Sequence, residues 1–255
     1  MTTHQESIID QFTRQAIPFT QLYAHSNQES LDLLVEMAGA SDRDTVLDVA
    51  CGSGIVACAF AKVADRVIGI DITPAMLEQA SVLAERKGLK NLSWQQGDIE
   101  KLPFPDESFS IVTSRYAFHH FLQPDVVMSE MMRVCRRGGR VLIADVALPQ
   151  EKVEAYDRLE KLRDPSHTHA LTLEEFSQLI ANNNLQNVSW KFYKVELELE
   201  QQLAASFPNY GDKDRIRQIF REDIGIDNLG VGAHYRGSEI HYAVPIAVVV
   251  GEKIS

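Results

Sequence analysis

The chain has 255 residues, of which 45% are hydrophobic and 24% charged, which suits one globular α/β domain. The formal net charge is −11 and no basic cluster occurs, so the composition favours a small-molecule partner over a nucleic acid. The 3 cysteines form no CxxC pair, which predicts a reduced, cytoplasmic setting. The N-terminal residues do not resemble a signal peptide, and no apolar run is long enough to predict a membrane span.

Short apolar strands alternate with helices through the first two thirds of the chain. The first forty residues read as helical, because Leu31, Leu34 and Val35 share one face of residues 28–39. The expected strands are 45–50, 66–71, 92–98, 109–115 and 140–147, and the expected helices between them are 55–64, 73–88 and 124–139. This alternation predicts a doubly wound parallel sheet with helices on both faces and a ligand site beyond the carboxyl ends of its strands.

The pattern loosens after Pro149. Thr172 and Glu175 have the spacing of a capping box at the start of a helix. The other elements expected here are a helix over 151–163, a loop over 164–170, a strand over 188–199, a helix over 212–223 and a last strand over 241–251. Residues 201–238 read as an insertion before that last strand.

The glycine-rich segment 52–57 matches the pattern GxGxxG/A, which holds a pyrophosphate in nicotinamide enzymes. Asp71 ends the next strand at the spacing expected of a ribose-binding acid. Taken alone, these residues predict a nicotinamide-dependent oxidoreductase.

Three further features favour another ligand. Asp48 precedes the glycines, and its carboxylate would repel a pyrophosphate but attract an ammonium group. Asp98 ends the third strand, where its carboxylate can accept a hydrogen bond from an exocyclic amine. Ile72 and Ile99 follow the two strand-end acids and can clamp a flat base. The ligand implied carries an ammonium group, a ribose and an aminopurine without phosphates, and S-adenosylmethionine fits that description.

The segment 45–147 resembles the class I S-adenosylmethionine-dependent methyltransferases, and most closely the small-molecule subgroup that includes the ubiquinone and menaquinone biosynthesis methyltransferases. The resemblance rests on LDVACGSG, VIGIDITPAML, GDIEKLPFPDESFSIV, SRYAFHHF and RVCRRGGRVLIAD, in that order. Ala50 and Cys51 stand where glycine is common in the first motif. The resemblance implies a seven-stranded Rossmann-like sheet with an antiparallel last strand. We expect a single methyltransferase domain over 1–255, with a helical lid (1–40), a cofactor-binding core (41–150) and a C-terminal part that carries acceptor-site elements (151–255).

The resemblance also implies roles for individual residues. Asp71 is expected to bind both ribose hydroxyls, Asp98 the adenine amine and Asp48 the ammonium group, while Gly52 and Gly54 let the backbone approach the methionine part. The other residues expected around the cofactor are Ala50, Ile72, Met76, Gly97, Ile99, Ser114, Arg115 and, in the lid, Tyr23. No metal is expected.

Methyl transfer to a hydroxyl or carbon acid also needs a base, and histidine suits that task near neutral pH. His119 and His120 follow the fourth strand, and His167 with Asp164 forms a second candidate pair in the loop after residue 163. Phe12, Phe19 and Tyr23 are candidates for the aromatic face of the lid. The residues considered for the acceptor wall in the late insertion are Tyr210, His234, Tyr235 and Arg236.

Three functions therefore remain open at the level of sequence. The leading one is methyl transfer from S-adenosylmethionine to oxygen, carbon or nitrogen of a small molecule. The second is the nicotinamide-dependent oxidoreductase, which lacks a recognisable Tyr-x-x-x-Lys relay here. The third is a protein that binds S-adenosylmethionine without methyl transfer. The sequence leaves the acceptor open, and a homodimer is compatible with it.

Overall fold

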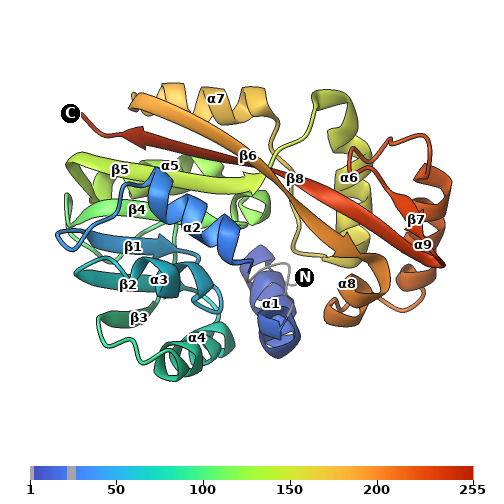
Figure 1. Ribbon diagram of the computed structural model, residues 1–255, viewed down its shortest axis with the longest axis horizontal. Coiled ribbons are helices and arrows are strands. Elements are labelled where there is room, and N and C mark those ends of the chain that lie inside the picture. Colours follow the sequence, from blue (N-terminus) through green and yellow to red (C-terminus); the bar gives the residue numbers. More distant parts are fainter. Residues whose placement is uncertain (1–2, 22–26, 255) are drawn as a thin grey trace.

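In the computed structural model, which describes residues 3–21 and 27–254, the chain forms one mixed sheet flanked by helices (Figure 1). The strands are β1 Thr45–Val49, β2 Arg66–Asp71, β3 Leu92–Gln96, β4 Phe109–Arg115, β5 Cys135–Val146, β6 Gln186–Glu198, β7 His234–Arg236 and β8 Glu239–Glu252. Their order is β3-β2-β1-β4-β5-β8-β6, and β7 pairs with the start of β8. The first five strands are parallel, and β8 runs antiparallel to both β5 and β6. The doubly wound sheet with an antiparallel last strand is confirmed, while the hairpin β7–β8 adds a strand that the sequence did not predict.

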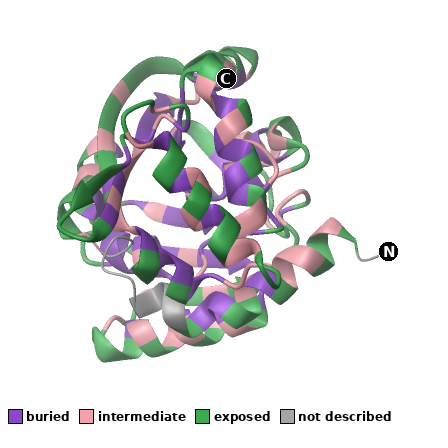
Figure 2. Ribbon diagram, turned by 90° about the vertical axis from the view of Figure 1, so that its right-hand side faces the viewer, coloured by how far each residue is buried: buried purple, intermediate pink, exposed green. Residues whose placement is uncertain are grey.

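The helices cover both faces of the sheet, as expected for buried parallel strands. They are α1 His4–Gln21, α2 Gln28–Met37, α3 Ile55–Phe60, α4 Pro74–Arg86, the 3-10 turn η2 Phe118–His120, α5 Pro124–Val134, α6 Gln150–Arg163, α7 Leu173–Asn182, α8 Leu199–Ala205 and α9 Asp212–Asp223. One apolar core lies under α2, α3, α6, α8 and α9, and a second lies under α5 and α7. Figure 2 shows the buried residues gathered on the strands and the inward sides of these helices.

Several element boundaries predicted from the sequence are wrong. Strand β3 ends at Gln96, so Asp98 follows the strand instead of ending it. Helix α3 ends at Phe60 rather than at residue 64, since the amides of Lys62 and Val63 bond carbonyls only three residues back. Helix α5 ends at Val134, and β5 begins before the Gly138–Gly139 pair instead of after it. The glycine amide at 138 donates to the carbonyl of Lys253, so pairing with the C-terminal segment keeps these glycines in the sheet.

The turn between β1 and α3 holds two glycines in the left-handed region, with φ of +51° at Gly52 and +75° at Gly54. A Cβ at Gly54 would come within 2.5 Å of the Trp94 ring, so this turn packs closely on β3. A Cβ at Gly52 would meet no atom within 4 Å. The first glycine therefore faces open space, and the second fixes how the helix leaves the sheet.

The C-terminal part follows the predicted order closely. The capping box at α7 is confirmed, because the Thr172 hydroxyl accepts from the Glu175 amide and the Glu175 carboxylate accepts from the Thr172 amide. Strand β6 runs along the outer side of β8, and the insertion contains the end of α8, all of α9 and the short strand β7. Among residues 3–21 and 27–254, no helix combines the length and apolar character needed to cross a membrane.

Candidate active site

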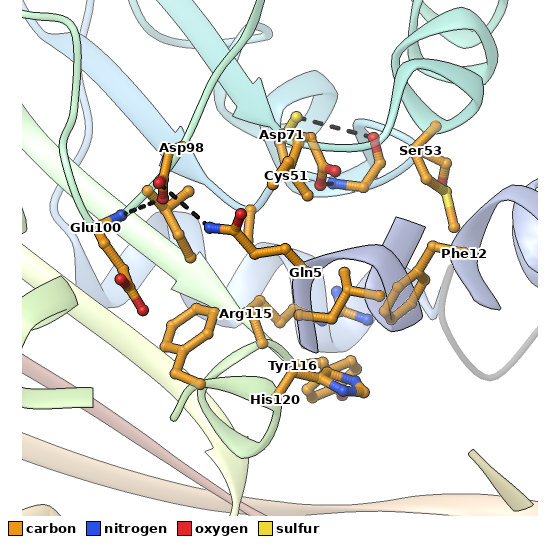
Figure 3. Close-up of a pocket in the computed structure, with 18 of the residues that line it drawn as sticks. Gln5, Phe12, Cys51, Ser53, Asp71, Asp98, Glu100, Arg115, Tyr116 and His120 are labelled. Carbon is orange, nitrogen blue, oxygen red and sulfur yellow. Dashed lines mark hydrogen bonds between the residues drawn. The ribbon is translucent and has the colours of Figure 1, made fainter. Parts of the chain in front are cut away.

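A pocket lies at the carboxyl ends of β1, β2 and β4, where such sheets bind ligands. Helix α1 closes one side of it, as Figure 3 shows with Gln5 and Phe12 facing the strand ends. The predicted cofactor residues that line this pocket are Ala50, Gly52, Asp71, Ile72, Met76, Asp98, Ile99 and Arg115. Residues from five separate elements thus meet in one cavity, which we call the first pocket.

Asp71 is the most firmly held acid of the first pocket. Its Oδ2 accepts from the Gly52 amide at 2.8 Å and its Oδ1 from the Thr73 amide at 2.8 Å. Burial raises the pKa of this carboxyl, although the two amides act in the opposite direction. Each carboxylate oxygen has a second lone pair, so both can still accept hydrogen bonds from a ligand with two adjacent hydroxyls.

Asp98 lies exposed at the mouth of the first pocket (Figure 3). Its Oδ1 accepts from the amide of Glu100 at 2.9 Å, and its Oδ2 accepts from the side chain of Gln5 at 3.3 Å. Ile72 and Ile99 line the same pocket and are only partly buried. An acceptor beside two exposed apolar faces fits a flat ring with an exocyclic amine.

Asp48 lies behind the first pocket rather than in its wall. It is 1% exposed, and its Oδ2 accepts from the Ala57 amide in the first turn of α3 at 3.0 Å. Burial raises its pKa to about 7, and the neighbouring charge of Asp71 acts in the same direction. Two close, buried carboxylates make this turn unfavourable for a pyrophosphate and favourable for a cation.

Helix α1 joins the strand ends through three contacts. Besides the bond from Gln5 to Asp98, the ring Nε2 of His4 donates to the carbonyl of His120 at 2.7 Å. The ring of Phe12 packs edge-on against the ring of His120, with centroids 5.1 Å apart. Phe12, proposed from the sequence for the lid, thus lines the cavity. Tyr23 lies outside the described residues, and so does the side chain of Phe19.

A second pocket adjoins the first and shares Phe12, Tyr116 and His120 with it. Its apolar wall comes from the end of β5, the last part of β6 and the middle of β8. The residues of that wall are Val146, Val195, Leu197, Val244 and Ile246. The polar residues around it are His119, Asp145, Tyr156, Glu160, Arg163, Asp164, Gln202 and Tyr242. Most of the surface exposed inside the second pocket is apolar, as in many small-molecule sites, although eight polar side chains also line it.

His119 and Asp145 form a hydrogen-bonded pair in the second pocket. The Nδ1 of His119 lies 2.6 Å from Oδ1 of Asp145, whose other oxygen accepts from the Phe118 amide at 2.7 Å. Burial disfavours the imidazolium form of His119, but the carboxylate outweighs it and raises the histidine pKa above its ordinary value of 6.5. No described residue bonds Nε2, so this nitrogen is left for a ligand.

His120 has the opposite electrostatic setting. Burial, reinforced by the neighbouring His119, lowers its pKa to about 3. Its Nδ1 lies 3.1 Å from the carbonyl of Ser166 and 3.2 Å from the Ser166 hydroxyl. The ring is therefore neutral at physiological pH and tied to the loop over the site.

The predicted pairing of Asp164 with His167 is not what the structure shows. The Nε2 of His167 lies 2.7 Å from Oδ1 of Asp157, whereas Asp164 accepts from the amide and the hydroxyl of Ser166. The loop turns tightly after α6, so Asp164 bonds two residues ahead and His167 reaches back to the helix. Asp164 lines the second pocket, but His167 lines neither pocket.

Several other sequence-derived candidates stand apart from the cavities. Gly54, Gly97 and Ser114 are not among the residues that line the first pocket. The four residues considered for the acceptor wall in the late insertion are all exposed and line neither pocket; they are Tyr210, His234, Tyr235 and Arg236. The insertion contributes Gln202 to the second pocket instead.

Asp145, Glu160, Arg163 and Gln202 are among the polar lining residues that the sequence did not indicate. For Asp145 a signal was present, because it interrupts the apolar run of the fifth strand near its carboxyl end. For the other three no comparable signal exists, since their approach to the site depends on how α6 and α8 pack.

The fold and the acidic strand ends together define the cofactor site of a class I S-adenosylmethionine-dependent methyltransferase. Residues 47–143 match the family model described as a methyltransferase domain. The uncharacterised methyltransferase YcgJ of Bacillus subtilis is 38% identical over 249 residues, which are 95% of this chain and 97% of that protein. This chain therefore belongs to the methyltransferase family, and its cofactor is S-adenosylmethionine.

Two further comparisons agree with this membership. The crystal structure of YcgJ superposes with a TM-score of 0.82 at 29% identity and covers 90% of this chain and 100% of that one. The ubiquinone/menaquinone biosynthesis C-methyltransferase UbiE of Pseudomonas putida is 34% identical over 129 residues, which are 48% of this chain and 50% of that protein. The second similarity is thus confined to about half of each chain.

Proposed function

We propose that the protein transfers the methyl group of S-adenosylmethionine to a small molecule held in the second pocket. The observation that carries the proposal is the junction of the two pockets at Tyr116 and His120, with the His119–Asp145 pair in the second. A donor and an acceptor in adjoining cavities can be aligned for in-line displacement, which contributes about 7–11 kcal/mol in well-oriented systems.

The described residues of the first pocket fit the cofactor. Gly52 leaves room for the methionine part, because a Cβ there would meet nothing within 4 Å. Asp71 would bind the ribose hydroxyls, Asp98 the adenine amine, and Asp48 would attract the ammonium group from behind the turn. When bound, S-adenosylmethionine supplies an electrophilic methyl group on a sulfonium. Helix α1 excludes water from one side of the site.

His119 is the group that we assign as the base. Asp145 fixes its Nδ1 and raises its pKa, so the free Nε2 can take a proton from an acceptor hydroxyl near neutral pH. His120 is the weaker candidate, because its lowered pKa makes it a poor base. This assignment favours an acceptor whose attacking oxygen or carbon must lose a proton, although an amine nitrogen fits the same geometry.

To test the proposal, the protein is incubated with S-adenosylmethionine that carries a labelled methyl group and with each of a panel of hydroxylated and amine acceptors. The release of S-adenosylhomocysteine is then measured. The proposal predicts acceptor-dependent release and a labelled product. His119→Gln should slow that release by about 10²–10⁴-fold and leave the affinity for S-adenosylhomocysteine unchanged. Binding of the cofactor without turnover on any acceptor would instead support a protein that binds S-adenosylmethionine without methyl transfer.

The proposal also includes the division of the chain into parts, the binding partners and the cellular location. The lid (1–40) and core (41–150) form the cofactor site, and elements of 151–255 provide the acceptor wall. The net charge of −11 opposes a nucleic acid acceptor. A cytoplasmic enzyme fits the cysteine pattern, and a homodimer is testable by light scattering.

A further inference from the structure

Two tyrosine hydroxyls open into the second pocket from different elements. Tyr156 belongs to α6 and Tyr242 to β8, and both side chains line the pocket although they are only 6% and 4% exposed. Each hydroxyl oxygen keeps accessible surface, unlike the side-chain oxygen of Gln202 in the same wall. Because the rest of each tyrosine side chain is packed against the protein, a ligand in the pocket can reach these two oxygens.

Neither hydroxyl is satisfied by the protein. Among the residues that the structure describes, none forms a hydrogen bond with the hydroxyl of Tyr156 or of Tyr242. Tyr116, which lines the same pocket, differs from them, because its hydroxyl lies 2.7 Å from the hydroxyl of Tyr193. One pair of tyrosines at the site is therefore bonded within the protein, and the other pair has its O–H groups left for a ligand.

Both hydroxyls keep their protons near neutral pH. Burial raises the pKa of Tyr156 and of Tyr242, and the negative charge of Glu160 acts in the same direction, while the charge of Arg163 opposes it. Since this one ion pair acts on both phenols, both lie near it. As un-ionised phenols, they can each donate one hydrogen bond.

Two unpaired O–H groups in a largely apolar cavity favour a ligand that accepts hydrogen bonds. A donor that is removed from water without a partner is unfavourable, so a ligand that covers these hydroxyls has to offer them an acceptor. A carbonyl oxygen has two lone pairs and can accept from both hydroxyls, whereas an ammonium group can accept from neither.

Resting on the proposed function, we propose that the methyl acceptor carries a carbonyl-type oxygen, of a neutral carbonyl or of a carboxylate, which accepts hydrogen bonds from the hydroxyls of Tyr156 and Tyr242. The atom that receives the methyl group faces Nε2 of His119, and the carbonyl-type oxygen is a second point of attachment. The two tyrosines are thus specificity residues, since an acceptor without this oxygen leaves both hydroxyls unpaired.

Three phenols of similar length test the proposal in calorimetric and ligand-observed NMR titrations of protein saturated with S-adenosylhomocysteine. The probe 4-(4-hydroxyphenyl)-2-butanone carries a ketone, 3-(4-hydroxyphenyl)propanoate a carboxylate, and 4-butylphenol only an apolar chain. The affinity of each oxygen-bearing probe is divided by that of 4-butylphenol for the same protein variant. This ratio removes any effect of a substitution that is common to all three probes.

Tyr156→Phe and Tyr242→Phe each remove one hydroxyl and keep the ring. Each should lower the affinity ratio about three- to tenfold for the ketone, the carboxylate or both, and the probe whose ratio falls identifies the source of the oxygen. The matched control is Tyr235→Phe, at an exposed position that lines neither pocket, and it should leave both ratios unchanged.

A structural role for the two hydroxyls would give a different result. Because neither has a partner among the described residues, Tyr156→Phe and Tyr242→Phe should keep the wild-type midpoint of denaturant unfolding. Both should also keep the wild-type affinity for S-adenosylhomocysteine, since neither tyrosine lines the first pocket.

Two results would overturn the proposal. One is a pair of affinity ratios that stays at the wild-type value in either tyrosine variant, and the other is no binding of either oxygen-bearing probe at millimolar concentration. Both would leave the proposed function standing as long as S-adenosylhomocysteine binds. Absence of that binding in the folded wild-type protein would instead refute the proposed function itself.

Discussion

Neighbouring carboxylates at the strand ends differ in task because their surroundings differ. Asp71 faces the first pocket, and its carboxylate oxygens can accept further hydrogen bonds. Asp48 instead accepts a hydrogen bond from a backbone amide in the first turn of α3. Asp145, on β5 and two strands away from β1, holds a histidine. The same residue type therefore serves ligand binding, helix anchoring and base activation, and the hydrogen-bond partners decide which.

The His119–Asp145 pair can be tested without knowing the acceptor. In NMR titrations the ring of His119 should titrate above pH 6.5, because the carboxylate outweighs burial. Asp145→Asn removes the main influence that opposes burial and leaves only the smaller ones of Glu160 and Asp164, so the midpoint should fall to lower pH. As a base, wild-type His119 would lose activity as pH falls through its raised pKa, and the acid limb of the variant would move to lower pH.

Retained affinity for S-adenosylhomocysteine in Asp145→Asn would show that the variant is folded. An unchanged His119 midpoint in that folded variant would contradict the assignment of Asp145 as the group that tunes the base.

At the residue scale, the sequence was most informative where function lies at strand ends. Asp71 and Asp98 could be placed in the site from motif spacing alone, since the carboxyl ends of parallel strands meet at one edge. Gln202 and the Glu160–Arg163 pair could not, because the packing of α6 and α8 against β6 and β8 brings them in. The hydrogen bond between His167 and Asp157 could not be predicted either, because no rule of local spacing indicates it.

At the element scale, the turn after β1 joins the sheet to the cofactor site. Gly52→Ala should cost about 1–2 kcal/mol of folding stability, from the left-handed backbone alone. Gly54→Ala should cost about 1–3 kcal/mol more, since its Cβ would lie 2.5 Å from the Trp94 ring. Denaturant unfolding of the two variants measures their free energies of unfolding. Equal losses of free energy would show that the close packing on β3 does not add to the cost at Gly54.

Element types were predicted better than element ends. The alternation of strands and helices fixed the doubly wound sheet, because each apolar run matches one buried strand. The end of α5 was placed at the glycines, yet those glycines belong to β5, where they pair with the C-terminal segment. A glycine pair marks the end of a helix only when the glycines do not pair in a strand instead. Pairing with a segment far along the chain cannot be seen in the local sequence.

At the scale of the whole molecule, α1 bridges elements that are far apart in the sequence. It contacts α4 on one side and α8 on the other, and it lines both pockets (Figure 1). A ligand in the first pocket should therefore stabilise α1 against local opening.

Hydrogen exchange measures that coupling. With S-adenosylhomocysteine at about 100 times its dissociation constant, amides of α1 should exchange up to about 100-fold more slowly, if opening of α1 releases the ligand. Helix α9 lines neither pocket and should change little. Equal protection of both helices, or none in α1, would contradict the role of α1 as a lid.

The most direct test of the account is a calorimetric titration of the wild type and Asp71→Ala with S-adenosylhomocysteine, and of the wild type with NADH. We predict one-to-one binding of S-adenosylhomocysteine to the wild type, a loss of about 10–100-fold in Asp71→Ala as charged hydrogen bonds are removed, and no binding of NADH. A folded wild-type protein that binds NADH in place of S-adenosylhomocysteine would contradict the account.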